Sequence, residues 1–570
     1  MSVKSDDKSR WQILLLLGAF ALALAMRMIH LGAIPLRDME AQAALQALAM
    51  ARGEKTLFGP HMAVVGLTSL DFLIFTSSNF IARFWTAFFG SLIVVVPFLF
   101  RKQLGWWAAA ITSFVLAVAP DLVGLSRVIG SPIVALVCLL LGLGFLIHRK
   151  PILSGIFLAL ALMSGVDFWL GGVILLVSSL IVSRLFPLSE LFSIFPIENP
   201  KGFFTYFGFS MGLTLLVVGT GFFMAPAGLS GIMSGLVDFI KGFGRPYTAP
   251  YFLLPLAILT YAGAAIPLGI WGSLRGILNQ SKFDLFLLVW WLVGFILIML
   301  YPGSRPENTV WVTVPLWVLS VRVLYYAWQQ PDENRLVSVG TAVLVVVLSA
   351  FILLALRSLV NPSIGQDLKE NYLIALVGGA VLIIAFVLLV NFGWSEQVAL
   401  AGLLIGVVVV ASAWMISTSV NSTGLNGERS AELWFPDEPE LTTVWLTQSI
   451  EQVLLWNKTG DSPEMLAVSE IGSPGMQWAL RDYPAVTYLD FIPTTIRPGM
   501  VITTDQENLA LVSGYRGQDL VWSSEVLWQE MSAYDYLTWL VVRDAPKLNE
   551  NLIFWVRTDL MPDSQFELIN

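Results

Sequence analysis

The chain has 570 residues, of which 56% are hydrophobic and 13% are charged, and its mean hydropathy is +0.75. This number of charged residues is too small to cover the surface of a soluble protein of this length. Most of the chain must therefore be solvated by lipid. The net charge of −8 argues against a nucleic-acid partner, which needs a basic face. The single cysteine, Cys138, excludes an internal disulfide and a cysteine metal site.

Apolar runs of about 18 to 25 residues alternate with short polar loops, and a helix needs about 20 residues to cross the hydrocarbon. We therefore predict an α-helical polytopic membrane protein with about thirteen transmembrane helices. The first run is too long for a cleavable signal and is interpreted as an anchor. The predicted spans are Trp11–Ile29, Phe80–Phe100, Leu104–Pro120, Val128–Ile147, Pro151–Ser164, Phe168–Leu185, Phe203–Phe223, Tyr251–Trp271, Phe283–Tyr301, Val310–Trp328, Leu336–Leu356, Tyr372–Asn391 and Gln397–Ser417.

Basic residues are distributed unevenly between the two sets of loops. The more basic set begins at the N-terminus and recurs at every second loop, so the positive-inside rule makes it cytoplasmic. An odd number of spans then places the C-terminal segment outside the plasma membrane, although merging the short fifth and sixth spans would invert everything after them. The residues that set this orientation are Lys4, Lys8, Arg10, Arg101, Lys102, Arg149, Lys150, Arg184, Lys201, Arg275, Lys282 and Arg335.

Two of the predicted outer loops contain helix signals within the membrane domain, residues 1–417. The first outer loop, residues 30–79, has a helix that Asp38 caps and that stops at Arg52-Gly53. The second holds an amphipathic stretch, Leu229–Phe243, which we expect at the membrane interface.

The composition changes after the last span. Residues 418–440 are polar and are predicted to be a linker, and residues 441–570 are predicted to form a soluble extracytoplasmic α/β domain. Within it we predict an amphipathic helix at Leu441–Trp456. The predicted strands are Met465–Ser469, Val486–Leu489, Met500–Thr503 and Leu552–Val556.

The first outer loop carries two carboxylates, Asp38 and Glu40, just beyond the membrane surface. Such a pair would suit a general base acting on a sugar hydroxyl, or a divalent cation such as Mg²⁺ or Mn²⁺. The alternative is structural, because Asp38 would cap the helix while Glu40 complements its dipole.

Two further outer segments each contain an arginine that could either bind a phosphate or have a structural role. Arg127 would hold a phosphate bidentately or simply reach the interface, with Asp121 as its salt-bridge partner. Arg305 would bind a lipid-phosphate head group, or stiffen its turn by pairing with Glu307. A lone loop histidine such as His61 is more often structural.

The predicted spans contain few charged residues, whereas ion-coupled transporters bury ionisable groups near the bilayer midplane. The charges gather instead at the outer rim. This distribution favours chemistry or binding at the outer surface over transport.

Taken together, these features resemble the GT-C superfamily of polytopic glycosyltransferases, of the protein mannosyltransferase and aminoarabinose transferase type. The acidic first loop, the segment Ile81–Gly90 with Arg83, and the segment Pro120–Arg127 each resemble a motif of that superfamily. Within it, Gln477–Tyr483 resembles the "WYLRDY" signature of a prokaryotic group called flippase-associated membrane proteins.

The resemblance implies a membrane glycosyltransferase that moves a sugar from a polyprenyl-phosphate-linked donor to a glycan or protein acceptor at the outer face. Asp38 would be the general base, and Glu40 its neighbour or a metal ligand. Arg127 and Arg305 would contact the donor phosphate. The other candidate substrate-binding residues are Asp121, Glu307, His61 and Arg83.

One departure from the family pattern leaves an alternative open. Many active members carry an acidic residue about five positions after the arginine of the third motif. Ser131-Pro132 stand there in this chain, so the second acidic function is missing or has moved to Asp121. The alternative function is a non-catalytic partner of a lipid-linked glycan flippase or polymerase.

Overall fold

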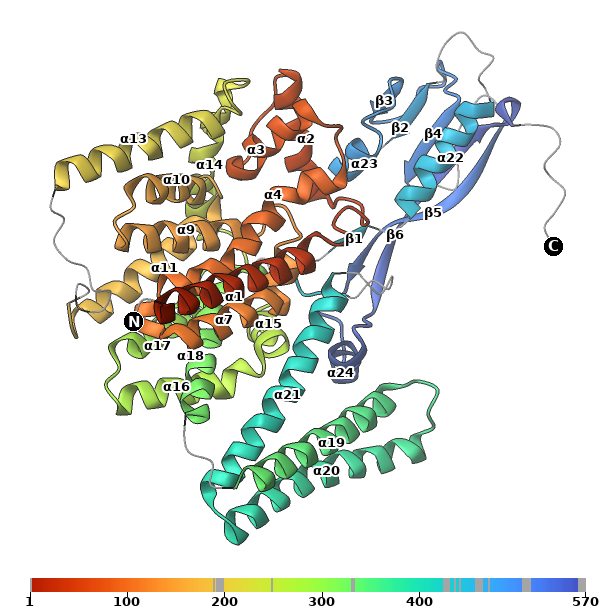
Figure 1. Ribbon diagram of the computed structural model, residues 1–570. Helices are drawn as coiled ribbons and strands as arrows, with labels where there is room; N and C mark the ends of the chain where they lie inside the picture. The colour runs from red at the N-terminus through yellow and green to blue at the C-terminus, as the bar shows by residue number, and fades with distance from the viewer. Residues whose placement is uncertain are drawn as a thin grey trace.

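A helical membrane domain and a six-stranded sheet make up the protein (Figure 1). The sheet lies beyond one end of the helical bundle, on the side that also carries the first outer loop. The computed structural model describes residues 3–187, 190, 199–247, 250–329, 334–423, 431–434, 437–439, 442–456, 465–469, 472–504 and 514–561.

Most of the membrane domain consists of long apolar helices. Among the described residues, nine segments are long and apolar enough to cross a membrane, and a pair bent by 89°, α15 (Leu253–Ala262) and α16 (Ala265–Leu278), makes a tenth. The nine are α1 (Val3–Met28), α4 with its continuation through η1 and α5 (Asn79–Leu99), α11 (Val166–Ser183), α13 (Pro200–Gly219), α17 (Lys282–Leu300), α18 with η3 (Pro306–Trp328), α19 (Arg335–Val360), α20 (Gln366–Gly393) and α21 (Glu396–Ser422).

The multi-pass architecture is confirmed, but the count of thirteen is not. Each predicted span contains a helix, yet three of these helices have 12 to 15 residues, which is short of the length that spans a bilayer upright. They are α7 (Trp106–Val118), α9 (Ile133–Ile147) and α10 (Pro151–Leu162).

The loop helices form where the sequence predicts them. α2 spans Asp38–Arg52, and Gly53 ends it with a φ of 68°, a conformation that glycine adopts without a steric penalty. The predicted N-cap is wrong, because Arg37 holds the extended cap position and Asp38 is the first helical residue. α3 (Met62–Ile74) completes the first outer loop, and α14 (Leu229–Gly242) is the predicted amphipathic helix.

The C-terminal domain is built on a mixed sheet of strand order β1-β5-β6-β4-β2-β3. β2 pairs in parallel with β3 and β4, whereas β6 pairs antiparallel with β4 and β5. α22 (Thr442–Trp456) packs on this sheet, and α23 (Pro474–Ala479) and α24 (Ala533–Val542) project from it. The strands are β1 (Asp437–Pro439), β2 (Leu466–Ser469), β3 (Val486–Leu489), β4 (Met500–Thr504), β5 (Tyr515–Val526) and β6 (Lys547–Arg557).

Part of the predicted linker is buried against the membrane domain. Residues 424–430, 435–436 and 440 lie outside the described residues, but 431–434 are all buried. The Tyr261 hydroxyl donates to Glu432, and the Trp434 ring lies 4.0 Å from the Tyr261 ring. A Cβ at Gly124 would come within 2.6 Å of Trp434, so Gly124 makes room for this segment.

The Trp478 region joins the two domains. Trp478 is buried, stacks on Phe72 at 5.8 Å and donates its indole N–H to Asn79 Oδ1 at 2.8 Å. Arg481 lies over the Trp478 ring at 4.0 Å and donates to the Ser77 carbonyl at 2.9 Å. We call Trp478 and Arg481 with these three partners the domain clasp.

We expect Trp478→Ala to destabilise the docked C-terminal domain by about 3–5 kcal/mol, because it removes a buried ring and its hydrogen bond. Thermal unfolding in detergent and limited proteolysis between the domains would measure the loss. Trp445→Ala is the matched control, since that side chain is 60% exposed. Equal midpoints for the two variants would contradict the clasp.

Candidate functional site

Three consecutive side chains at the start of α2 point toward three different parts of the protein. Asp38 contacts α23 of the C-terminal domain, and Met39 contacts Arg305 in the turn before α18. Glu40 contacts Arg83 on α4. The helix start is therefore the point at which both domains and the turn before α18 meet.

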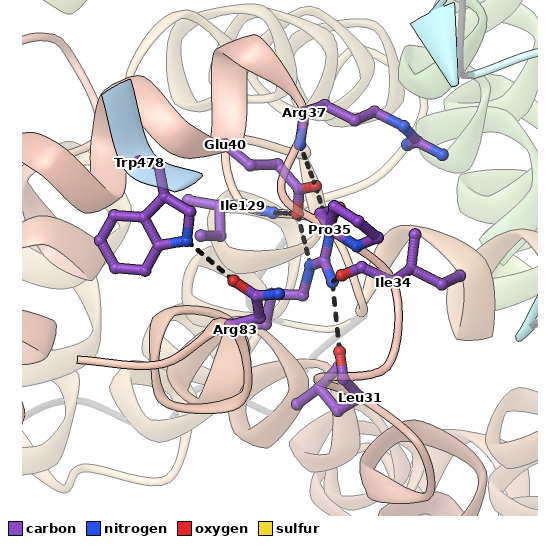
Figure 2. Close-up of polar contacts among 9 residues, drawn as sticks. Leu31, Ile34, Pro35, Arg37, Glu40, Arg83, Ile129 and Trp478 are labelled. Carbon is purple, nitrogen blue, oxygen red and sulfur yellow. Dashed lines mark hydrogen bonds and ion pairs between the residues drawn. The ribbon is translucent and has the colours of Figure 1, made fainter. Parts of the chain in front are cut away.

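Glu40 and Arg83 form a buried ion pair (Figure 2). Arg83 Nε donates to Glu40 Oε1 at 2.8 Å and Nη2 donates to Oε2 at 2.6 Å, and the Glu40 side chain is 1% exposed. Glu40 also accepts from the backbone N–H groups of Ile129 and Arg37. The remaining Arg83 donors reach the carbonyls of the loop before α2, at Leu31, Ile34 and Pro35.

This network makes Glu40 a permanent carboxylate. Burial alone would raise the pKa of Glu40, but the charge and hydrogen bonds of Arg83, together with the Arg37 charge and the Ile129 N–H, outweigh burial and hold that pKa below its ordinary value. Because four protein donors occupy its two oxygens, Glu40 has little capacity left for a metal ion. Among the described residues, no group of three His, Cys, Asp or Glu side chains converges to hold one.

Asp38 is exposed and bridges the two domains. Its Oδ1 accepts from the Ser473 hydroxyl at 2.6 Å and from the Gly475 N–H at 2.9 Å. Both donors belong to the start of α23, so one carboxylate oxygen is used for docking. An exposed carboxylate can still accept a proton, which keeps Asp38 available as a base.

Arg305 is a partly exposed cation beside the start of α2. Its side chain is 27% exposed, lies 3.5 Å from Glu307, and approaches the Met39 sulfur at 3.9 Å. The predicted Arg305–Glu307 pair is thus formed. Glu307 raises the pKa of Arg305, so this guanidinium stays charged.

Asp167 and His61 stand close to Arg305. Asp167, at the start of α11, is 1% exposed and accepts from Asn308 Nδ2 at 2.6 Å. His61 lies between Gly130 and Gly165, where a Cβ on either glycine would come within 3.3 Å of the ring. Burial and the nearby Arg305 lower the pKa of His61 to about 4, so its imidazole is neutral at neutral pH.

Arg127 and Asp121 do not pair, which corrects the salt bridge considered from the sequence. Arg127 donates to the carbonyls of Arg27 and Ile29, at 3.0 and 2.8 Å, and to that of Thr423 at 3.2 Å. Asp121 accepts from the Thr313 hydroxyl on α18. Arg127 therefore ties the ends of α1 and α21 together with bonds that a phosphate would have to replace.

Sequence reasoning missed Arg27 and Asp167. Arg27 is fully buried and donates to Ser126 and to the carbonyls of Leu116 and Ala117. Asp167 directly precedes the predicted span Phe168–Leu185, and the structure places it in the first turn of α11. A charged residue inside an apolar run is a signal that could have identified both, because such residues are costly unless they have partners or a function.

Six of the eight predicted residues form two connected groups. Asp38, Glu40 and Arg83 surround the start of α2, and Arg305, Glu307 and His61 lie around the turn before α18, whereas Arg127 and Asp121 belong to neither group. Met39 links the two groups through its contact with Arg305. An exposed carboxylate and a partly exposed guanidinium on a rigid helix end can accept a proton and hold an anion.

We expect Glu40→Gln to destabilise the protein by about 3–5 kcal/mol at pH 7, because it leaves Arg83 buried without its counter-charge. A carboxyl whose folded pKa is depressed stabilises above its unfolded value of 4.5 and loses that contribution as the pH falls. The difference in stability between the wild type and the variant should therefore shrink below pH 4.5. Unfolding midpoints in detergent at pH 7 and pH 3.5 would measure it, and a gap that is the same at both would contradict the pairing.

Comparison with known proteins shows the fold. No family model and no curated protein matches the chain. Among solved structures, ArnT from Cupriavidus metallidurans bound to undecaprenyl phosphate is similar over 97% of this chain and 99% of that one, at 14% identity and a TM-score of 0.53. The apo state of ArnT is similar over 98% of this chain and 99% of that one, at 14% identity and a TM-score of 0.51. An oligosaccharyltransferase from Archaeoglobus fulgidus covers 84% of this chain and 63% of that one, at 14% identity and a TM-score of 0.41. The chain thus shares the fold of ArnT, and the expected helical membrane domain with a C-terminal sheet domain is confirmed.

Proposed function

We propose that this protein is a membrane glycosyltransferase that moves a sugar from a polyprenyl-phosphate-linked donor to an acceptor at the outer face of the plasma membrane. The observation that carries the proposal is the charged group at the start of α2, where Asp38 and Arg305 stand on either side of Met39. The fold shared with ArnT, which was solved with undecaprenyl phosphate, supports a lipid-phosphate donor.

In this mechanism Arg305 holds the donor phosphate by charge-assisted hydrogen bonds, and the positive end of α2 adds to the attraction. The Asp38 carboxylate takes the proton of the acceptor hydroxyl, whose oxygen attacks the anomeric carbon of the sugar. The bond from that carbon to the phosphate oxygen breaks, and the lipid phosphate leaves with the electron pair. Direct displacement inverts the configuration of the sugar carbon.

The Glu40–Arg83 pair positions Asp38, because it fixes the first turn of α2 against α4. A Mg²⁺ or Mn²⁺ ion shared by Asp38 and Glu40 does not fit this arrangement, since Glu40 is already occupied by protein donors. The mechanism therefore assigns the phosphate charge to Arg305.

We expect Asp38→Asn to reduce sugar transfer by about 10²–10⁴-fold, because the amide cannot take a proton. Asparagine keeps an acceptor oxygen for Ser473 and Gly475, so folding should be retained. Release of lipid phosphate from radiolabelled polyprenyl-phosphate sugars would measure the effect, with and without Mg²⁺ or Mn²⁺. Asp490→Asn, at an exposed site, is the control. A fully active Asp38→Asn protein would remove Asp38 from the role of base.

We expect Arg305→Gln to raise the KM for the donor about tenfold or more, because a charge-assisted bond to phosphate is lost. Steady-state kinetics with varied donor would measure it. Arg357→Gln, at an exposed site at the end of α19, is the matched control. A KM equal to that of the control would show that the donor phosphate does not bind here.

The second candidate is the non-catalytic partner of a lipid-linked glycan flippase or polymerase. It is favoured by the use of Asp38 in docking and by the pairing of Arg305 with Glu307, which already neutralises that guanidinium. Saturable binding of a polyprenyl-phosphate sugar without release of lipid phosphate from any donor would support this function over the first.

A further inference from the structure

A cavity of about 940 Å³ lies between the first outer loop and the C-terminal domain. Its membrane-domain wall includes Asp38 and Phe80, and its opposite wall includes Glu525 of β5 and Asn549 and Glu550 of β6. The volume is at the upper end of the range of about 300–1,000 Å³ for sites that enclose small ligands.

The lining favours a ligand rich in hydroxyl groups. Carboxylates and amides accept or share hydrogen bonds with hydroxyls, and Glu525, Asn549 and Glu550 are all exposed on one wall. Phe80 is 42% exposed on the facing wall and offers an aromatic surface. Mixed polar and aromatic linings of this kind suit sugars, which have hydroxyl edges and apolar faces.

The charges separate this cavity from the place where a phosphate would bind. Three carboxylates in the lining, Asp38, Glu525 and Glu550, outnumber its two guanidinium groups, Arg37 and Arg481, whereas Arg305 contacts Met39 and is absent from the lining. A lipid phosphate is therefore favoured near Arg305, and an uncharged polyhydroxyl ligand is favoured here.

The cavity is held open by contacts that do not depend on a ligand. The domain clasp fixes one side, and the Asp38 bonds to Ser473 and Gly475 fix the floor. The Ser523 hydroxyl donates to Glu550 at 2.7 Å and the Ser524 hydroxyl donates to Asn549 at 3.1 Å, which orients both side chains of the far wall. A preformed cavity avoids part of the entropy cost of binding.

We propose that this cavity binds the acceptor and that the acceptor is a neutral oligosaccharide. The proposal rests on the proposed function, because it places the reacting hydroxyl beside Asp38. There the hydroxyl proton passes to the Asp38 carboxylate, the hydroxyl oxygen bonds to the anomeric carbon of the donor sugar, and polyprenyl phosphate leaves with the electrons of the broken bond. Glu525 and Asn549 determine specificity for the acceptor and take no part in the bond-making step.

Saturation-transfer NMR on the full chain in detergent would test binding, with neutral tri- to pentasaccharides of glucose, mannose and N-acetylglucosamine as probes. We expect saturable binding that weakens at least tenfold in the double variant Glu525→Gln, Asn549→Ala. Glu530→Gln is the matched control, because Glu530 is exposed and lies outside the cavity. Both altered side chains are exposed, so unchanged unfolding midpoints should show that the double variant folds.

Failure of this proposal can be told apart from failure of the proposed function. If no probe binds, or if the double variant binds as the wild type does, the cavity is not a saccharide site. If the wild type transfers sugar but the double variant binds the probes as tightly as the wild type does, the acceptor proposal fails and the glycosyltransferase function stands. If probes bind in a cavity-dependent way but no donor reacts, the saccharide site stands and the transferase fails.

Discussion

The arrangement of the region where the two domains meet depends on the buried pair between Glu40 and Arg83. Two opposite charges inside a protein are tolerated because they satisfy each other at 2.6 Å and because their remaining atoms bond to backbone groups. The carbonyls of the loop before α2 converge on Arg83, so the pair fixes both the path of that loop and the first turn of the helix. Every other contact of the helix start is made from this fixed position.

One helix turn consequently serves three purposes. Asp38 docks the C-terminal domain, Met39 contacts the turn before α18, and Glu40 anchors the helix to α4. In an α-helix successive side chains are about 100° apart, so three neighbours necessarily face three directions. The proposed base, phosphate contact and acceptor cavity therefore all lie within reach of a single turn.

Much of the architecture follows from the sequence, because lipid imposes a simple length and polarity rule on helices. Capping logic also placed the end of α2 at Gly53 correctly, and it missed the N-cap by one residue. The count of spans was less predictable, since α7, α9 and α10 are too short to cross alone and their apolar residues do not reveal this. β5 was missed because polar residues such as Gln518 and Asp519 interrupt its apolar pattern.

The sequence identified several residues of the candidate site, but it did not predict which groups these residues contact. Asp38 and Glu40 were singled out as a pair, yet their carboxylates face different parts of the protein. Arg127 was assigned to a phosphate, although it bonds to carbonyls 98, 100 and 296 positions away in the chain. Such partners are determined by tertiary packing, which the spacing of residues along the sequence does not predict. Trp478 and Arg481, by contrast, join the two domains directly.

The C-terminal domain is attached to the membrane domain at a second point, far from α23. In α24 the Tyr534 hydroxyl donates to the Val360 carbonyl at the end of α19 and accepts from Lys369 at the start of α20. α19 and α20 form an outlying hairpin (Figure 1), and the apolar window of α20 is only 11% buried, so lipid surrounds most of it. The tilt of such a hairpin adjusts to the thickness of the bilayer. The strands β5 and β6, which flank α24 in sequence, form one wall of the cavity, so this wall is joined through α24 to a helix hairpin that lies in lipid.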